Sequence, residues 1–72
     1  MKLKEWIKKS TFKELEKLAK KVGCHPRYLY QIVNNGCSAG LAKKIEKFTQ
    51  KVTPGKVVYK WELRPDIWKK GE

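Results

Sequence analysis

The sequence predicts a small all-α domain: a helix-turn-helix bundle of four to five short helices, followed by an extended or β-strand C-terminal segment. Apolar residues recur at helical spacing from residue 3 to residue 49, and capping residues, glycine or proline separate the stripes. A chain of 72 residues has room for one small core only. We therefore expect residues 1–72 to form one domain, with the helix-turn-helix at about residues 12–34 and a packing or oligomerisation tail at about residues 53–72.

The first two predicted helices are separated by Ser10 and Thr11. Thr11 and Glu14 fit a capping box, in which each side chain satisfies a free amide at the start of the second helix. Gly23 ends this helix, because glycine takes the positive φ of a helix C-terminus without strain. The first helix has the apolar face Leu3, Trp6 and Ile7, and the second has the stripe Phe12, Leu15, Leu18, Ala19 and Val22.

The third and fourth helices have equally clear starts. Pro26 suits the first turn of a helix, and residues 34–36, Asn-Asn-Gly, end the third helix. Ser38 is the predicted cap of the fourth. The buried face of the third helix is Leu29, Ile32 and Val33, and that of the fourth is Leu41, Ala42, Ile45, Phe48 and Thr49, with Lys43, Lys44, Lys47 and Lys51 outside it.

The pattern changes at residues 53–55, Thr-Pro-Gly, which predict a turn. Alternating apolar residues over 57–63 then predict a strand, which pairs with its copy on a second subunit or lies extended over the bundle. Pro65 opens a short turn or helix that ends near Trp68.

The charge of the chain indicates a polyanionic partner. Eighteen Lys and Arg against seven Asp and Glu give a net charge of +11, and neutralising phosphates with such cations releases counterions. The alternative is a lysine-rich surface that serves solubility alone. We find no long apolar run and no signal-peptide pattern, so we expect a cytoplasmic protein without a membrane partner.

The sequence offers no chemistry for catalysis. Cys24, His25 and Cys37 supply only three potential ligands without zinc-type spacing, so we expect no metal and no cofactor. Reduced thiols suit a cytoplasmic protein, although the sequence leaves a disulfide open. No acid or nucleophile pattern accompanies His25, so we expect no enzyme.

Residues 15–32 carry the strongest functional signal. Ala19 supplies the small residue that two crossing helices require, and Gly23 follows four residues later in the turn. The apolar groups that close the angle are Leu18, Val22, Cys24, Leu29 and Ile32. This pattern predicts a DNA-binding helix-turn-helix whose second helix enters the major groove.

Three segments, Leu-Ala-Lys-Lys-Val-Gly at 18–23, Pro26 to Asn34, and Leu-Arg-Pro-Asp-Ile-Trp at 63–68, resemble a known family. The chain is similar over about residues 3–68 to small Cro-type regulators of phages and prophages, particularly the YdaS antitoxin/Cro-like group. The resemblance implies a mostly helical, dimeric or higher-order DNA-binding regulator in a bacterial or phage-infected cell. His25 and Tyr30 stand where that family usually has Ser, and Leu15 where it prefers a polar amide.

The outward face of the third helix supplies the candidate contacts. Arg27 pairs with a guanine edge and Gln31 with an adenine edge in the usual geometries. Tyr30 contacts a thymine methyl or a phosphate, or instead packs across the bundle. His25 caps the helix or touches a phosphate, which the helix N-terminus at Pro26 also favours. The remaining candidate DNA contacts are Asn34, Asn35, Ser38 and Lys43.

Other side chains receive structural roles. Arg64 is expected to pair with Asp66 or Glu62, and Tyr28 is placed nearer the core than the DNA. The remaining large aromatic residues are interpreted as core or dimer interface: Trp6, Phe12, Phe48, Trp61 and Trp68. The alternative for them is a stacking platform for single strands.

Together these features predict sequence-specific binding of double-stranded DNA by a homodimeric, Cro-like repressor. Its two recognition helices would lie about 34 Å apart, one DNA turn. Two other functions stay open. One is an antitoxin-type module that binds a protein partner through the aromatic tail, and the other is a non-specific architectural or RNA-binding protein.

Overall fold

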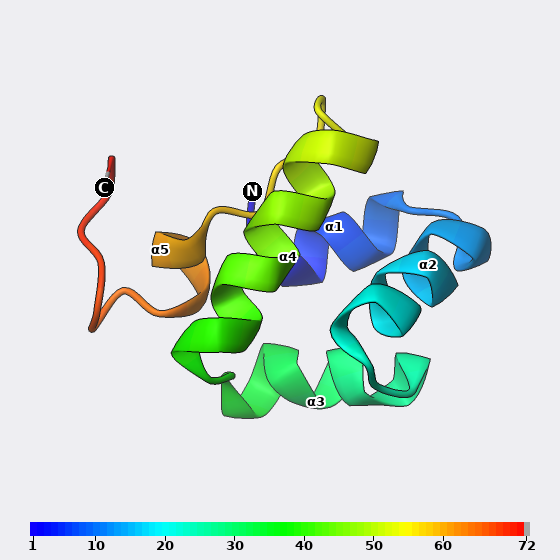
Figure 1. The fold of residues 1–72 in the computed structure, drawn as a ribbon, viewed down its shortest axis with the longest axis horizontal. Coiled ribbons are helices and arrows are strands. Elements are labelled where there is room, and N and C mark those ends of the chain that lie inside the picture. Colours follow the sequence, from blue (N-terminus) through cyan, green and yellow to red (C-terminus); the bar gives the residue numbers. More distant parts are fainter. Residues whose placement is uncertain (72) are drawn as a thin grey trace.

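The computed structural model describes residues 1–71, and within them every regular element is a helix. Figure 1 shows α3 along the lower edge, α2 and α4 rising from its two ends, α1 between them, and α5 outside α4. The predicted all-α fold is therefore confirmed. The helices are α1 (Leu3–Lys9), α2 (Phe12–Val22), α3 (Pro26–Asn35), α4 (Ala39–Val52) and α5 (Lys60–Leu63).

The predicted helix boundaries are set by the expected caps. The Glu14 amide donates to Thr11 Oγ1 over 3.2 Å, and the Thr11 amide donates to Glu14 Oε1 over 3.0 Å. Gly23 has a φ of 78°, the left-handed conformation that ends α2. The Leu41 amide donates to Ser38 Oγ over 3.2 Å at the start of α4. These starts and stops follow from neighbours within a few residues.

The core lies where α1, α2, α3 and α4 meet. Trp6 is fully buried and meets the Phe48 ring edge to face, with ring centroids 6.4 Å apart. The other buried apolar residues are Leu3, Leu15, Leu18, Ala19, Leu29, Ile32, Ala42, Ile45 and Val58. Phe12 does not belong to the core, because it is 67% exposed, so of its two predicted roles only the dimer interface stays a prediction. Phe12 is the first residue of α2, and helical side chains point back toward the N-terminus, here past the edge of the bundle.

The prediction of a strand over residues 57–63 was wrong for residues 60–63, which are helical, whereas residues 57–59 follow the predicted alternative of a segment extended over the bundle. Residues 57–59 are extended without a partner strand in the described chain, and α5 follows them at once. Side chains satisfy the backbone instead: the Val58 amide donates to Thr49 Oγ1 (3.0 Å), and the Lys60 amide to Glu46 Oε2 (2.9 Å). These bonds fix the segment along α4, so it needs no second strand.

The segment after α5 is held by Arg64. As predicted, Arg64 pairs with Asp66: Nε and Nη2 donate to the two carboxylate oxygens over 3.0 and 2.7 Å. Its Nη1 also donates to the Cys37 carbonyl over 2.9 Å, which joins this segment to the loop before α4. The Trp68 ring lies 5.8 Å from Lys43 Nζ and 5.2 Å from Lys60 Nζ, distances at which cation–π attraction operates. No helix in residues 1–71 has the length and apolar character needed to cross a membrane.

Candidate nucleic-acid interface

A turn of residues 23–25 joins α2 to α3. The Cys24 amide donates to the Ala19 carbonyl over 2.9 Å and closes the end of α2. His25 has an extended backbone, and its Nδ1 accepts a hydrogen bond of 3.1 Å from the Arg27 amide. Pro26 then occupies the first turn of α3. Ala19 is buried where the two helices pack, which fits the predicted requirement for a small residue.

The exposed face of α3 carries a row of polar side chains. Arg27, Gln31 and Asn34 follow one another at i, i+4 and i+7, so they lie along one side of the helix. All three are exposed, and no described residue forms a side-chain hydrogen bond or an ion pair with them. The row therefore presents free donors and acceptors to the solvent. Leu29 and Ile32 on the opposite face anchor the helix in the core.

One edge of this row is bordered by α1. A hollow of about 480 Å³ between α1 and α3 is lined by Ile7 and Val33, with Tyr30 and Asn34 from α3. Lys4 and Lys8, one helical turn apart on α1, line the same hollow and are exposed. Sequence reasoning missed both lysines. The sequence shows that Lys4 and Lys8 lie one helical turn apart, but it does not show that α1 packs beside α3.

The other edge is bordered by the start of α4. Tyr28, Ser38 and Lys44 line a hollow of about 450 Å³ there. The prediction that Tyr28 lies nearer the core was wrong, because the ring is 43% exposed. Asn35 and Gln31 line a smaller hollow of about 80 Å³ beside Tyr28. Lysines therefore stand on both sides of the polar row.

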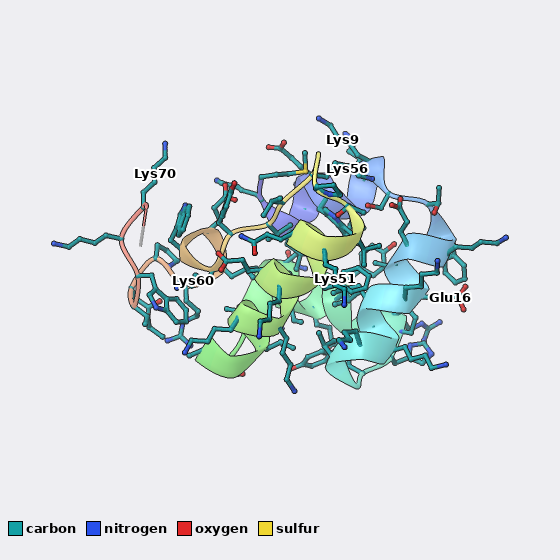
Figure 2. All side chains as sticks on the ribbon, turned by 45° about the horizontal axis from the view of Figure 1, so that its top comes forward. Lys9, Glu16, Lys51, Lys56, Lys60 and Lys70 are labelled. Atoms are coloured by element: carbon teal, nitrogen blue, oxygen red, sulfur yellow. The ribbon has the colours of Figure 1, made fainter. Side chains whose placement is uncertain are left out.

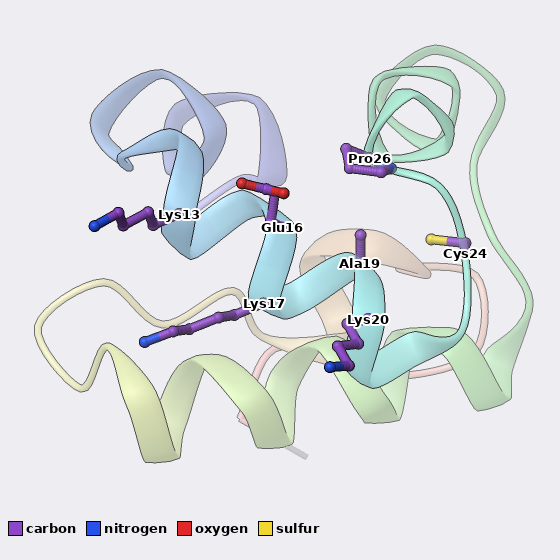
Figure 3. Close-up of a pocket in the computed structure, with 7 residues that line it drawn as sticks. All are labelled: Lys13, Glu16, Lys17, Ala19, Lys20, Cys24 and Pro26. Atoms are coloured by element: carbon purple, nitrogen blue, oxygen red, sulfur yellow. The ribbon is translucent and has the colours of Figure 1, made fainter.

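The third side, next to the start of α3, includes a carboxylate among its lysines. Figure 3 shows Glu16 and Ala19 directed toward the side on which Pro26 lies, whereas Lys13, Lys17 and Lys20 extend away from it. These residues line a hollow of about 470 Å³. Glu16 is the one carboxylate among three lysines in this lining, so it offsets part of the positive charge on this side of α3.

The candidate residues divide into three groups. Arg27, Tyr30, Gln31, Asn34 and Asn35 are brought together on the exposed side of α3. His25 and Ser38 serve as helix caps at its two borders, and Pro26 is half-buried. Lys43 lies over the Trp68 ring, on the side of α4 that carries the C-terminal tail. Its neighbour Lys44 takes the position beside α3 that the sequence assigned to Lys43.

The two cysteines of the described chain, Cys24 and Cys37, are half-buried. Burial raises the pKa of the Cys24 thiol; burial also raises the pKa of Cys37, although the nearby Arg64 charge opposes it. Both thiols are therefore protonated at neutral pH, and both are free rather than disulfide-bonded. No cluster of three or more His, Cys, Asp or Glu that could hold a metal occurs in residues 1–71.

No protein-family model, curated protein or solved structure matches this chain. The described residues form a small all-helical fold, and α3 has an exposed face. Its helix-turn-helix pair presents a polar row between two sets of lysines.

Proposed function

We propose that this protein binds double-stranded DNA sequence-specifically by inserting α3 into the major groove. The observation that carries the proposal is the unpaired row of Arg27, Gln31 and Asn34 on a short, well-anchored helix. The major groove is about 12 Å wide and admits an α-helix with its side chains. The net charge of +11 supplies the attraction for a polyanion.

Within the groove, each polar side chain of the row has a base edge that suits it. Arg27 matches the two acceptors of guanine, and Gln31 matches the donor and acceptor of adenine. A good pair of either kind contributes about 1–3 kcal/mol of discrimination against the wrong base. Tyr30, exposed at the edge of the row, is positioned for a thymine methyl group or a phosphate.

The lysines on either side of the row supply backbone contacts. Lys4 and Lys8 on α1 and Lys44 on α4 border α3 at opposite edges. Side chains on both sides of a helix in the major groove face the phosphates of the two opposite strands. Such contacts position the protein without reading sequence.

A homodimer would place two copies of α3 in successive turns of the groove, about 34 Å apart. A protein bound in this way over a promoter blocks it, so we propose repression in the manner of a Cro-like regulator. No chemical step is involved.

The experiment that tests the proposal is selection from a randomised duplex library, performed on the wild type and on Arg27→Ala combined with Gln31→Ala. We expect a palindromic motif with the wild type and its loss with the double variant. Lys4→Gln combined with Lys8→Gln is the matched control, because it should lower affinity and keep the motif. Salt-sensitive binding without any enriched motif would contradict sequence-specific recognition.

A further inference from the structure

A second lysine-rich surface lies between α2 and α4, and we call it the α2–α4 groove. It is a hollow of about 660 Å³, larger than the hollows around α3. Figure 2 shows Lys51 on the side of α4 that faces α2. Its walls include Lys21, Lys44, Lys47 and Lys51, and the apolar residues Phe48 and Val52 also line it.

The positive charge of the α2–α4 groove is uncompensated. No Asp or Glu is among its lining residues. Among the described residues, the ion pairs join Met1 to Glu62, Lys56 to Glu14 and Arg64 to Asp66, so none involves a lysine of the groove. A ligand with several negative groups would therefore complement the charge of the α2–α4 groove.

This surface extends well beyond the face of α3. The 14 residues of α4 span about 21 Å from Ala39, next to α3, to Val52. Lys44 lies near α3, but Lys47 and Lys51 lie progressively farther along the helix. A rigid duplex seated on α3 therefore leaves the far half of the groove free.

The exposed apolar residue Val52 decides which polyanion fits. Val52 is 44% exposed beside the lysines, whereas Phe48, at 7% exposed, contributes little surface to the same lining. A phosphodiester chain gains little from apolar contacts of this kind. An amphipathic helix uses both features, because its apolar side chains cover Val52 while its carboxylates meet the lysines.

We propose that the α2–α4 groove binds an acidic amphipathic helix of a partner protein. Lys47 and Lys51 hold carboxylates at the rim, and Val52 contacts the apolar side of the helix. The proposal is independent of DNA binding by α3, since the far half of the groove lies outside that face.

The test uses the full chain and a fluorescent 14-residue peptide, matched in length to α4, with Leu on one helical face and Glu on the other. Fluorescence anisotropy at physiological ionic strength measures its affinity. We expect Lys47→Gln combined with Lys51→Gln to weaken binding about three- to tenfold, as for two rim ion pairs. Val52→Ser should weaken it about threefold through lost apolar contact.

The matched control is Lys4→Gln combined with Lys8→Gln, which removes the same charge from α1 and should leave peptide affinity unchanged. Circular dichroism of each variant confirms that the helices persist. Absence of saturable binding, or an equal loss in both lysine pairs, would overturn the proposal. Equal affinity for a peptide with Ser in place of Leu would overturn it as well. The affinity for a mixed-sequence DNA duplex is measured with the same variants. If substitution of Lys47 and Lys51 lowers duplex affinity as much as peptide affinity, the groove binds nucleic acid instead.

Discussion

The indole Nε1 of Trp6 donates a hydrogen bond of 3.1 Å to the hydroxyl of Thr53, and both residues are buried. This bond connects α1 to the end of α4 across 47 residues of sequence. The Thr53 hydroxyl in turn donates its single proton to one of two nearby carbonyls, that of Thr49 at 3.1 Å or that of Lys56 at 3.2 Å. The core therefore contains a short polar chain rather than an apolar contact alone.

Thr53→Val removes the acceptor for the indole while keeping the shape of the side chain. An unsatisfied buried donor costs about 1–3 kcal/mol, and we expect the free energy of unfolding to fall by that amount in urea titrations. The control is the same substitution in the Trp6→Phe background, where no indole needs an acceptor. An identical loss in both backgrounds would show that the Trp6–Thr53 bond contributes nothing.

Gly23→Ala should destabilise the fold by about 1–2 kcal/mol, because its φ of 78° is unfavourable for a residue with a Cβ. A Cβ at Gly23 meets no atom within 4 Å, so strain alone is measured. Gly40→Ala is the matched control in the first turn of α4, where a Cβ is equally free of contacts. That change should stabilise by about 0.4–1 kcal/mol in thermal unfolding. Equal effects of the two substitutions would contradict the assigned conformations.

Lys4→Gln combined with Lys8→Gln should reduce the salt dependence of DNA binding. Each phosphate contact contributes about 0.9 to the slope of log K against log salt concentration, so the slope should become shallower by about 1.8. The control is Lys2→Gln combined with Lys9→Gln, which removes the same charge from exposed positions of the same region. Equal slopes for the two double variants would assign the effect to net charge rather than to contacts beside α3.

Glu14 should make stability depend on pH in the acid range. The Thr11 backbone amide and then the Lys56 side chain hold the pKa of Glu14 below its usual value of 4.5. The folded protein therefore binds this proton more weakly than the unfolded chain does. The stabilisation is present above pH 4.5 and is lost as pH falls through the lower, folded pKa.

Urea midpoints measured from pH 7 to pH 3 check this expectation. The wild type should exceed Glu14→Gln at neutral pH, and the difference should shrink in acid. Added salt should weaken the stabilisation that comes from the Lys56 charge and leave the stabilisation that comes from the hydrogen bond of the Thr11 amide. Parallel curves for the two proteins across the acid range would contradict a lowered pKa at Glu14.

The features predicted best are those that depend on near neighbours. The capping box of Thr11 and Glu14, the stop at Gly23, the start at Pro26 and the cap at Ser38 each involve atoms within about one helical turn. The pairing of Arg64 with Asp66 belongs to the same group, since only Pro65 lies between them.

The features that the sequence patterns did not place correctly depend on where a segment lies in the tertiary structure. Period-two alternation over 57–63 indicated a strand, but Thr49 and Glu46 on α4 take up its amides. Val58, placed by that pattern on the face opposite Val57, is the fully buried residue of the segment. Phe12 fits the apolar period of α2, yet its place at the first residue of the helix puts it beyond the bundle.

The sequence by itself determined the helical class, the boundaries of α1 to α4, the strong positive charge and the outward row of Arg27, Gln31 and Asn34. Each of these follows from composition, from periodicity or from hydrogen bonds between near neighbours. Only the tertiary structure decided which lysines lie beside α3, placing Lys4, Lys8 and Lys44 there and Lys43 over Trp68. The physical reason is that helix packing depends on contacts between residues far apart in the chain, and no local pattern records which helix faces meet.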